Sequence, residues 1–114
     1  MAVATVATAN LAALARSTNI LAGSVVEFVP ELSRVLIYSV PSASTATISV
    51  LADNDIAIDN QAFLRTSTTI DKSIDLMADF IVLPGTRLSI FFQETGNVAT
   101  TDFLTSVEVT PIGA

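Results

Sequence analysis

The stretch RVLIYSVPSASTATISVL, residues 34–51, carries two strand patterns with a break between them. In its second half Ala46, Ile48 and Val50 alternate with Thr and Ser, a period of two that is typical of a strand with one buried face. In its first half, RVLIYSV, apolar residues stand on both faces, as in a strand that is covered on both sides. Pro41 and the small residues after it interrupt the pattern. The stretch therefore predicts two β-strands joined by a turn.

The period of two recurs along the rest of the chain. It is present in VVEFV (25–29), DIAID (55–59), TTIDKSIDLMADF (68–80), TRLSIFFQ (86–93) and TDFLTSVEVT (101–110). The side chains that this pattern predicts to face inward are Val26, Phe28, Ile56, Ile58, Ile70, Ile74, Leu76, Ala78, Phe80, Leu88, Ile90, Phe92, Phe103, Val107 and Val109. Ile70, Ile74 and Met77 also have helical spacing, but the many β-branched residues of 68–80 favour a strand.

Turn residues divide these strands. Pro84-Gly85 predicts a tight turn, because Pro fixes φ and Gly tolerates positive φ. Gly96-Asn97 lies in a loop that is predicted to join the last two strands as a hairpin. We count about eight strands between Ser24 and Ile112. This pattern predicts an all-β fold, a compact antiparallel β-sandwich with the topology of a jelly roll, and an immunoglobulin-like sandwich is the alternative.

Residues 1–22 are predicted to be an N-terminal arm on a β-sandwich domain of residues 23–114. The arm lacks the basic start and continuous apolar run of a secretory signal, and no segment matches the roughly 20 apolar residues of a transmembrane span. Asn10 is a candidate cap for a short helix in which Leu11, Leu14 and Ala15 share one side, with Arg16 near its end. Two turns of helix are unstable alone in water. The arm must therefore dock, either on its own domain or on a neighbour, or stay disordered.

The composition indicates a surface that faces other proteins. Hydrophobic residues make up 51% of the chain and charged residues only 14%, against about a quarter charged in typical domains. This shortage of charge predicts a homo-oligomer, a dimer or a trimer. The net charge of −6 and the five scattered Lys and Arg residues oppose a nucleic-acid role, which requires clustered cations.

The candidate partner interface combines the apolar residues of the arm with the outward apolar residues of two strands. Strand 34–40 presents apolar side chains on its second face, and one Phe lies on the polar face of strand 86–93. The alternatives are a central or loop-covered strand and a singly exposed Phe, which is ordinary on protein surfaces. The candidate residues are Val3, Val6, Leu11, Leu14, Ile20, Leu21, Leu36, Tyr38 and Phe91.

The sequence predicts no catalytic site. Without His or Cys there is no His-based triad, no thiol nucleophile and no disulfide. Asp71, Asp75 and Asp79 share the outward face of strand 68–80, where neighbouring carboxylates are most often solvated. Glycosidase chemistry needs a carboxyl group with a raised pKa in a cleft, and no part of the sequence identifies one. We therefore expect that the protein is not an enzyme.

No metal or other cofactor is expected either. Asp53, Asp55 and Asp59 have a spacing that is superficially similar to a calcium loop. An EF-hand, however, requires Gly at its sixth position and Glu at its twelfth, and Ile58 and Leu64 stand there. A solvated turn is the better interpretation of these carboxylates.

The general character of the chain resembles that of one protein family. An Ala/Thr-rich terminal arm before an acidic β domain without His or Cys is similar to the small capsid decoration (cement) proteins of tailed bacteriophages. SIDLMADFIVLPGTRLSIFFQETG, residues 73–96, adds a strand–turn–strand cadence similar to a jelly roll. The resemblance implies a structural virion protein on the capsid exterior, assembled in the host cytoplasm. It also implies symmetric oligomers that bind the major capsid protein, with no nucleic-acid or membrane partner.

Two alternatives to a decoration protein stay open. A small single-jelly-roll capsid or coat protein is the nearer one. A non-enzymatic carbohydrate- or protein-binding module is the other. Sugar-binding sandwiches rely on aromatic platforms, and this chain has no Trp and a single Tyr, Tyr38.

Overall fold

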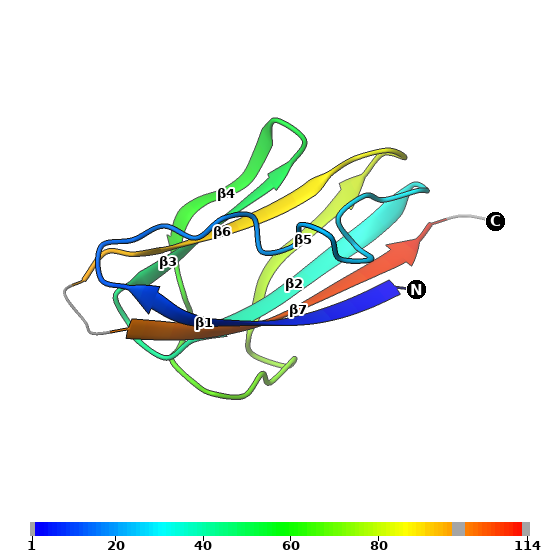
Figure 1. The fold of residues 1–114 in the computed structure, drawn as a ribbon. Coiled ribbons are helices and arrows are strands. Elements are labelled where there is room, and N and C mark those ends of the chain that lie inside the picture. The colour runs from blue at the N-terminus through cyan, green and yellow to red at the C-terminus, as the bar shows by residue number, and fades with distance from the viewer. Residues whose placement is uncertain (1, 97–99, 113–114) are drawn as a thin grey trace.

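Two antiparallel β-sheets pack face to face in the computed structural model, which describes residues 2–96 and 100–112 (Figure 1). No helix is present in these ranges. The predicted all-β sandwich is confirmed. The strands are β1 (Ala2–Ala12), β2 (Ser33–Pro41), β3 (Ala46–Ala52), β4 (Asp55–Ala62), β5 (Leu76–Val82), β6 (Leu88–Glu94) and β7 (Thr100–Pro111).

The strands pair in a nested order. One sheet has the order β1-β7-β2-β5 and the other β4-β3-β6. The first strand pairs with the last, β2 with β5, and β3 with β4. Residues 15–29 run beside β6 and fill the remaining place in this series. The order agrees with the predicted jelly roll and differs from the immunoglobulin-like alternative, in which the first strand lies beside the second.

The inward-facing residues of the strands form one core between the sheets. Ile48, Ile90 and Val107 are fully buried, as the period of two predicts. The rings of Phe92 and Phe103 stack with centroids 4.0 Å apart, and they join β6 to β7 across the sandwich. Phe63, which follows β4 and which the pattern did not single out, packs its ring about 6 Å from both.

Residues 25–29 are not the strand that the sequence predicted. Val26 and Val29 are buried, whereas Phe28 is 60% exposed. These residues lie in an irregular segment, residues 13–32, which touches β6 through single bridges and isolated backbone hydrogen bonds. The inward side chains are three residues apart because the chain turns here and loses the alternation of a strand.

The long strand predicted over residues 68–80 is also wrong in its first half. Only β5, Leu76–Val82, is a strand, and residues 63–75 form the loop that connects it to β4. Asp75, predicted to face solvent, is buried, while Ile74 is exposed. The loop lies along β2, where Ser67 N–H donates to Pro41 O and Ser39 N–H donates to Asp75 O. Hydrogen bonding to β2 therefore fixes the orientation of residues 67–75, and this orientation cannot be predicted from the alternation of apolar and polar residues.

Two smaller predictions need correction. The hairpin expected between the last two strands does not form, because β6 and β7 belong to different sheets. Asn97 of the expected turn lies outside the described residues. Ile56 of β4, predicted to face inward, is exposed because the pairing of β4 with β3 shifts register twice.

The expected N-terminal arm is part of the sandwich. β1 pairs with β7 from Ala2 to Ala12, so no structural boundary falls at residue 22. The short helix expected after Asn10 is absent, and residues 10–12 continue the strand. Ala4 and Val6 pack against the core, whereas their neighbours along the strand are exposed. A strand half-buried on one face explains why this segment is rich in small apolar residues.

Candidate assembly surfaces

Several large apolar side chains are exposed at one end of the sandwich. We call this surface the apolar end. The chain brings it together from three segments: the irregular segment before β2, the β5–β6 turn and the residue that follows β7. Its members are Val25, Phe28, Leu32, Leu83 and Ile112, whose exposed fractions range from 39% to 76%. Exposed apolar residues in one contiguous region mark interaction surfaces, whereas single ones are unremarkable.

Backbone hydrogen bonds hold the segments of the apolar end together. Gly85 N–H donates to Val29 O over 2.7 Å, and Val29 N–H donates to Thr86 O over 2.9 Å. Ile112 N–H donates to Leu32 O over 2.8 Å. The predicted Pro84-Gly85 turn is confirmed, and Gly85 has a positive φ of 82°. The start of β1 pairs with the end of β7, Ala2 opposite Val109, and these strand ends lie at the same end of the molecule (Figure 1).

The predicted interface residues are spread over the molecule. Val3 and Leu14 are exposed, and Leu21 is fully buried in the core of its own chain. The remaining members except Tyr38 are half-buried: Val6, Leu11, Ile20, Leu36 and Phe91. The structure brings none of them into the apolar end. The sequence missed that surface because its residues come from a turn and from irregular segments, where periodicity carries no information, and the apparent alternation in residues 25–29 placed Phe28 inward.

Tyr38 and Phe91 are covered within their own chain. The Tyr38 side chain is buried, and Lys72 Nζ from the β4–β5 loop lies 5.5 Å from the centroid of its ring. The Arg16 guanidinium carbon lies 4.9 Å from the centroid of the half-buried Phe91 ring. Both contacts have the geometry of a cation over an aromatic face. For residues 34–40, the structure agrees with the alternative of a central strand covered by a loop.

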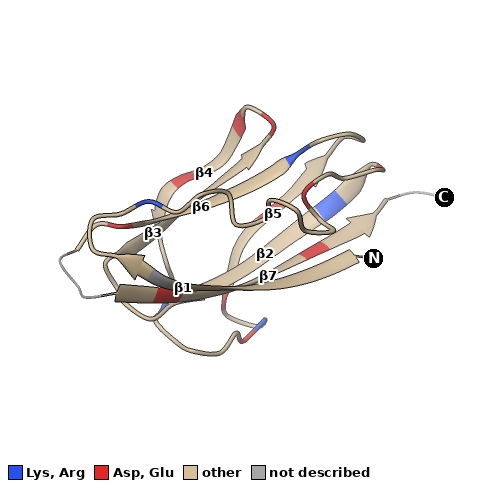
Figure 2. Cartoon of the chain, viewed as in Figure 1, with Lys and Arg blue, Asp and Glu red and all other residues tan. Residues whose placement is uncertain are grey.

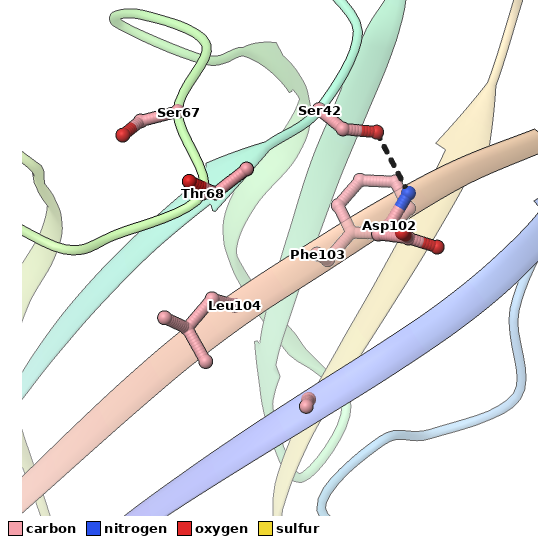
Figure 3. Close-up of a pocket in the computed structure, with 7 residues that line it drawn as sticks. Ser42, Ser67, Thr68, Asp102, Phe103 and Leu104 are labelled. Carbon is pink, nitrogen blue, oxygen red and sulfur yellow. Dashed lines mark hydrogen bonds between the residues drawn. The ribbon is translucent and has the colours of Figure 1, made fainter.

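A shallow pocket lies beside the β4–β5 loop (Figure 3). Its volume is about 230 Å³, and its polar members include Ser42, Thr68 and Asp102. Ser42 Oγ accepts a hydrogen bond of 2.9 Å from Asp102 N–H. Phe103 also lines the pocket, but its side chain is 97% buried because its ring stacks in the core. The pocket therefore presents no aromatic platform of the kind that sugar binding uses.

The carboxylates of the suspected calcium loop are dispersed. Asp53 Oδ1 accepts a hydrogen bond from Arg87 N–H, and Asp59 Oδ1 accepts one from Asn60 Nδ2. Among residues 2–96 and 100–112, no group of three or more His, Asp or Glu side chains is arranged to hold a metal ion. Nor does this part of the chain contain a helix long and apolar enough to cross a membrane.

Two buried carboxylates that the sequence did not identify have structural partners. Arg65 donates two hydrogen bonds to Asp75, at 2.8 and 2.7 Å, and this interaction lowers the pKa of the Asp75 carboxyl. Burial raises the pKa of Glu94, but hydrogen bonds from Thr101, Thr45 and Gly96 N–H outweigh burial and lower it overall. Both carboxylates are therefore held ionised and buried. A general acid requires the opposite, a raised pKa.

The cations of the protein are already engaged. Arg34, Arg65, Lys72 and Arg87 each form a salt bridge with a carboxylate, and Arg16 lies over Phe91. Figure 2 shows the basic residues apart from one another, with acidic residues distributed along the strands. The described surface therefore offers no basic patch for phosphates.

Comparisons with protein-family models, with curated protein sequences and with solved structures find no match for this chain.

Proposed function

We propose that the protein is a non-enzymatic structural subunit of a virion, a capsid decoration protein that binds the outer surface of a head shell. The observation that carries the proposal is the apolar end, where five large apolar side chains stand in solvent. Removing such side chains from water stabilises a complex by about 25 cal/mol per Å² of apolar area. In this proposal the apolar end docks on the major capsid protein.

Three further features support a structural role. The nested strand order is that of the jelly roll, which recurs in viral capsid proteins and also in lectins. The buried carboxylates Asp75 and Glu94 are engaged in holding the fold together. A shell repeats one contact many times, so a modest apolar surface on each subunit gains strength through multivalency.

The test is binding to head shells with the apolar end made polar. Phe28→Ser combined with Leu83→Ser removes the apolar end's largest side chain and the Leu of the β5–β6 turn. Co-sedimentation with shells is expected to fall at least tenfold, while the melting temperature changes little because both side chains are exposed. The matched control is Leu14→Ser with Leu64→Ser, two residues of similar exposure outside the apolar end. Equal binding by both double variants would overturn the docking role of the apolar end.

The nearest competing function is a single-jelly-roll coat protein that builds the shell itself. The same strand order favours it. Electron microscopy of the purified protein separates the two. A decoration protein forms small oligomers and adds to existing shells, whereas a coat protein assembles closed particles without any other component.

A further inference from the structure

The outer edge of β1 has no strand beside it. β1 lies at the edge of the four-stranded sheet and pairs only with β7 among the described residues. The pairing keeps an unbroken register from Ala2 to Thr8. In a regular strand, alternate N–H and C=O groups point away from the paired side. The free side of β1 therefore presents a row of unpaired backbone donors and acceptors.

β1 also lacks most of the features that normally protect a sheet edge, and its one register shift lies near its end, between Thr8 and Leu11. Natural edges carry charges, prolines, bulges or very short strands, which prevent pairing with another chain. β4 has Asp55 and Asp59, two register shifts, and a positive φ at Asn60. β5 is only seven residues long and carries Asp79. Residues 2–12 contain neither a charge nor a proline. Of these three edges, β1 is the one suited to pairing.

The exposed face of β1 is flat and uncharged. Val3, Thr5, Ala7 and Ala9 are exposed, and they alternate with half-buried residues. These short side chains let another strand approach without steric conflict. β7 carries two acidic residues across from β1. Glu108, opposite Val3, forms a salt bridge with Lys72, and Asp102 lies near the end of β1, between the partners of Thr8 and Leu11. β1 itself carries no charge in a protein of net charge −6.

We propose that β1 pairs antiparallel with β1 of a second copy across a two-fold axis, which joins the two four-stranded sheets into one continuous sheet. A two-fold axis perpendicular to the sheet places a strand antiparallel to its own copy, so β1 is geometrically complementary to itself. Two copies repel each other through their net charges, and β1 adds no charge of its own to that repulsion. The biological purpose of this dimer rests on the proposed assembly role. Its existence is tested on the isolated protein.

The two-fold axis also determines which residues meet. Side chains on one face of a strand meet side chains on the same face of the partner strand, because the period is two. Thr5 and Ala7 of one copy therefore lie close to outer-face residues of the other. Like charges placed there repel across the pair, and opposite charges attract. This relation provides a test that depends on pairing and on no other property of the strand.

The experiment measures the mass of the isolated protein by sedimentation equilibrium over micromolar concentrations. The wild type is expected at twice 11.9 kDa. Thr5→Glu with Ala7→Glu, and separately Thr5→Lys with Ala7→Lys, are each expected to weaken the dimer at least tenfold. An equimolar mixture of the two variants is expected to restore a dimer. The matched control, Ala57→Glu with Gln61→Glu on the exposed edge strand β4, adds the same charge and should leave the dimer unchanged.

Several outcomes would overturn the β1 pairing. They are a monomeric or trimeric wild type, a dimer that survives Thr5→Glu with Ala7→Glu, and a mixture that fails to recover. Circular dichroism of each variant shows whether the sandwich is intact, and these exposed substitutions should leave it so. Shell binding is measured separately with the apolar-end variants. Failure of the dimer and failure of shell binding are therefore distinguished.

Discussion

At the scale of single residues, the Glu94 carboxylate is held by hydrogen bonds from several segments of the chain. It is fully buried and accepts hydrogen bonds from Thr45, before β3, and from Thr101 of β7. It also accepts one from Gly96 N–H at 2.9 Å. Glu94 N–H donates to Ala15 O. Glu94 thus ties both sheets and the irregular segment together, because burying its charge requires every one of these donors.

Replacing Glu94 should therefore destabilise the fold. Glu94→Gln keeps the shape but removes the charge that these donors stabilise, and it should lower the free energy of unfolding at pH 7 by about 1–3 kcal/mol. Urea unfolding followed by circular dichroism measures the loss. The control is Glu31→Gln, an exposed carboxylate, which should have little effect. A Glu94→Gln protein as stable as the wild type would contradict the role of the buried charge.

At the scale of elements, side chains of the irregular segment take the place of some of the backbone hydrogen bonds that a regular strand would form with β6. Asn19 Oδ1 accepts hydrogen bonds from Leu21 N–H and Ile90 N–H. Ser17 Oγ accepts one from Phe92 N–H. Short polar side chains can satisfy backbone groups in this way and compete with regular structure. The eighth position of the sandwich is therefore held by an irregular segment, whose inward residues include Leu21 and Val26.

Removal of residues 1–22 should now prevent cooperative folding. The sequence predicted that these residues are an arm outside the β-sandwich domain, but they include β1, which pairs with β7 along its length. They also include Leu21, which is fully buried, and burial of one such side chain stabilises by about 1.5–3 kcal/mol. A protein that begins at Gly23 should show no sharp transition in differential scanning calorimetry. A transition at the wild-type temperature would contradict the structural role of β1.

At the scale of the whole molecule, acid should unfold the protein while neutral pH leaves its stability constant. The pKa values of Glu27, Asp71, Asp75, Asp79 and Glu94 are all lowered in the folded state. A lowered folded-state pKa contributes stability that is fully present above the unfolded-state value. For Asp and Glu these unfolded-state values are near 3.8 and 4.5. The contribution is lost as pH falls below them towards the lower folded-state values.

The expected measurement is a plateau of melting temperature between pH 6 and 7.5 and a steep fall below about pH 4.5. His, which would titrate within that plateau, is absent from the chain. The Glu94→Gln variant supplies an internal check. Its deficit relative to the wild type should shrink at low pH, because the wild type then loses the same charge. A deficit that grows as pH falls would contradict the direction of the Glu94 pKa.

The sequence by itself determined the fold class and most of the core. Alternation in residues 45–51, 86–93 and 101–110 identified β3, β6 and β7 and their inward residues, and the continuous apolar run in residues 34–40 identified β2. In a strand with one buried face, apolar and polar residues alternate, so the strand can be recognised from the sequence. Pro84-Gly85 likewise marked its turn, since the local backbone requirement is met by those two residues alone.

The tertiary structure decided what depends on contacts between distant segments. It placed β6 and β7 in different sheets, docked β1 on its own domain and buried Asp75 against Arg65. It also assembled the apolar end from a turn and from irregular segments. A period of two states only that a strand has an inner face, and it does not say which strand lies beside it. Strand order, sheet edges and surfaces built from several segments are therefore set by packing of the whole chain.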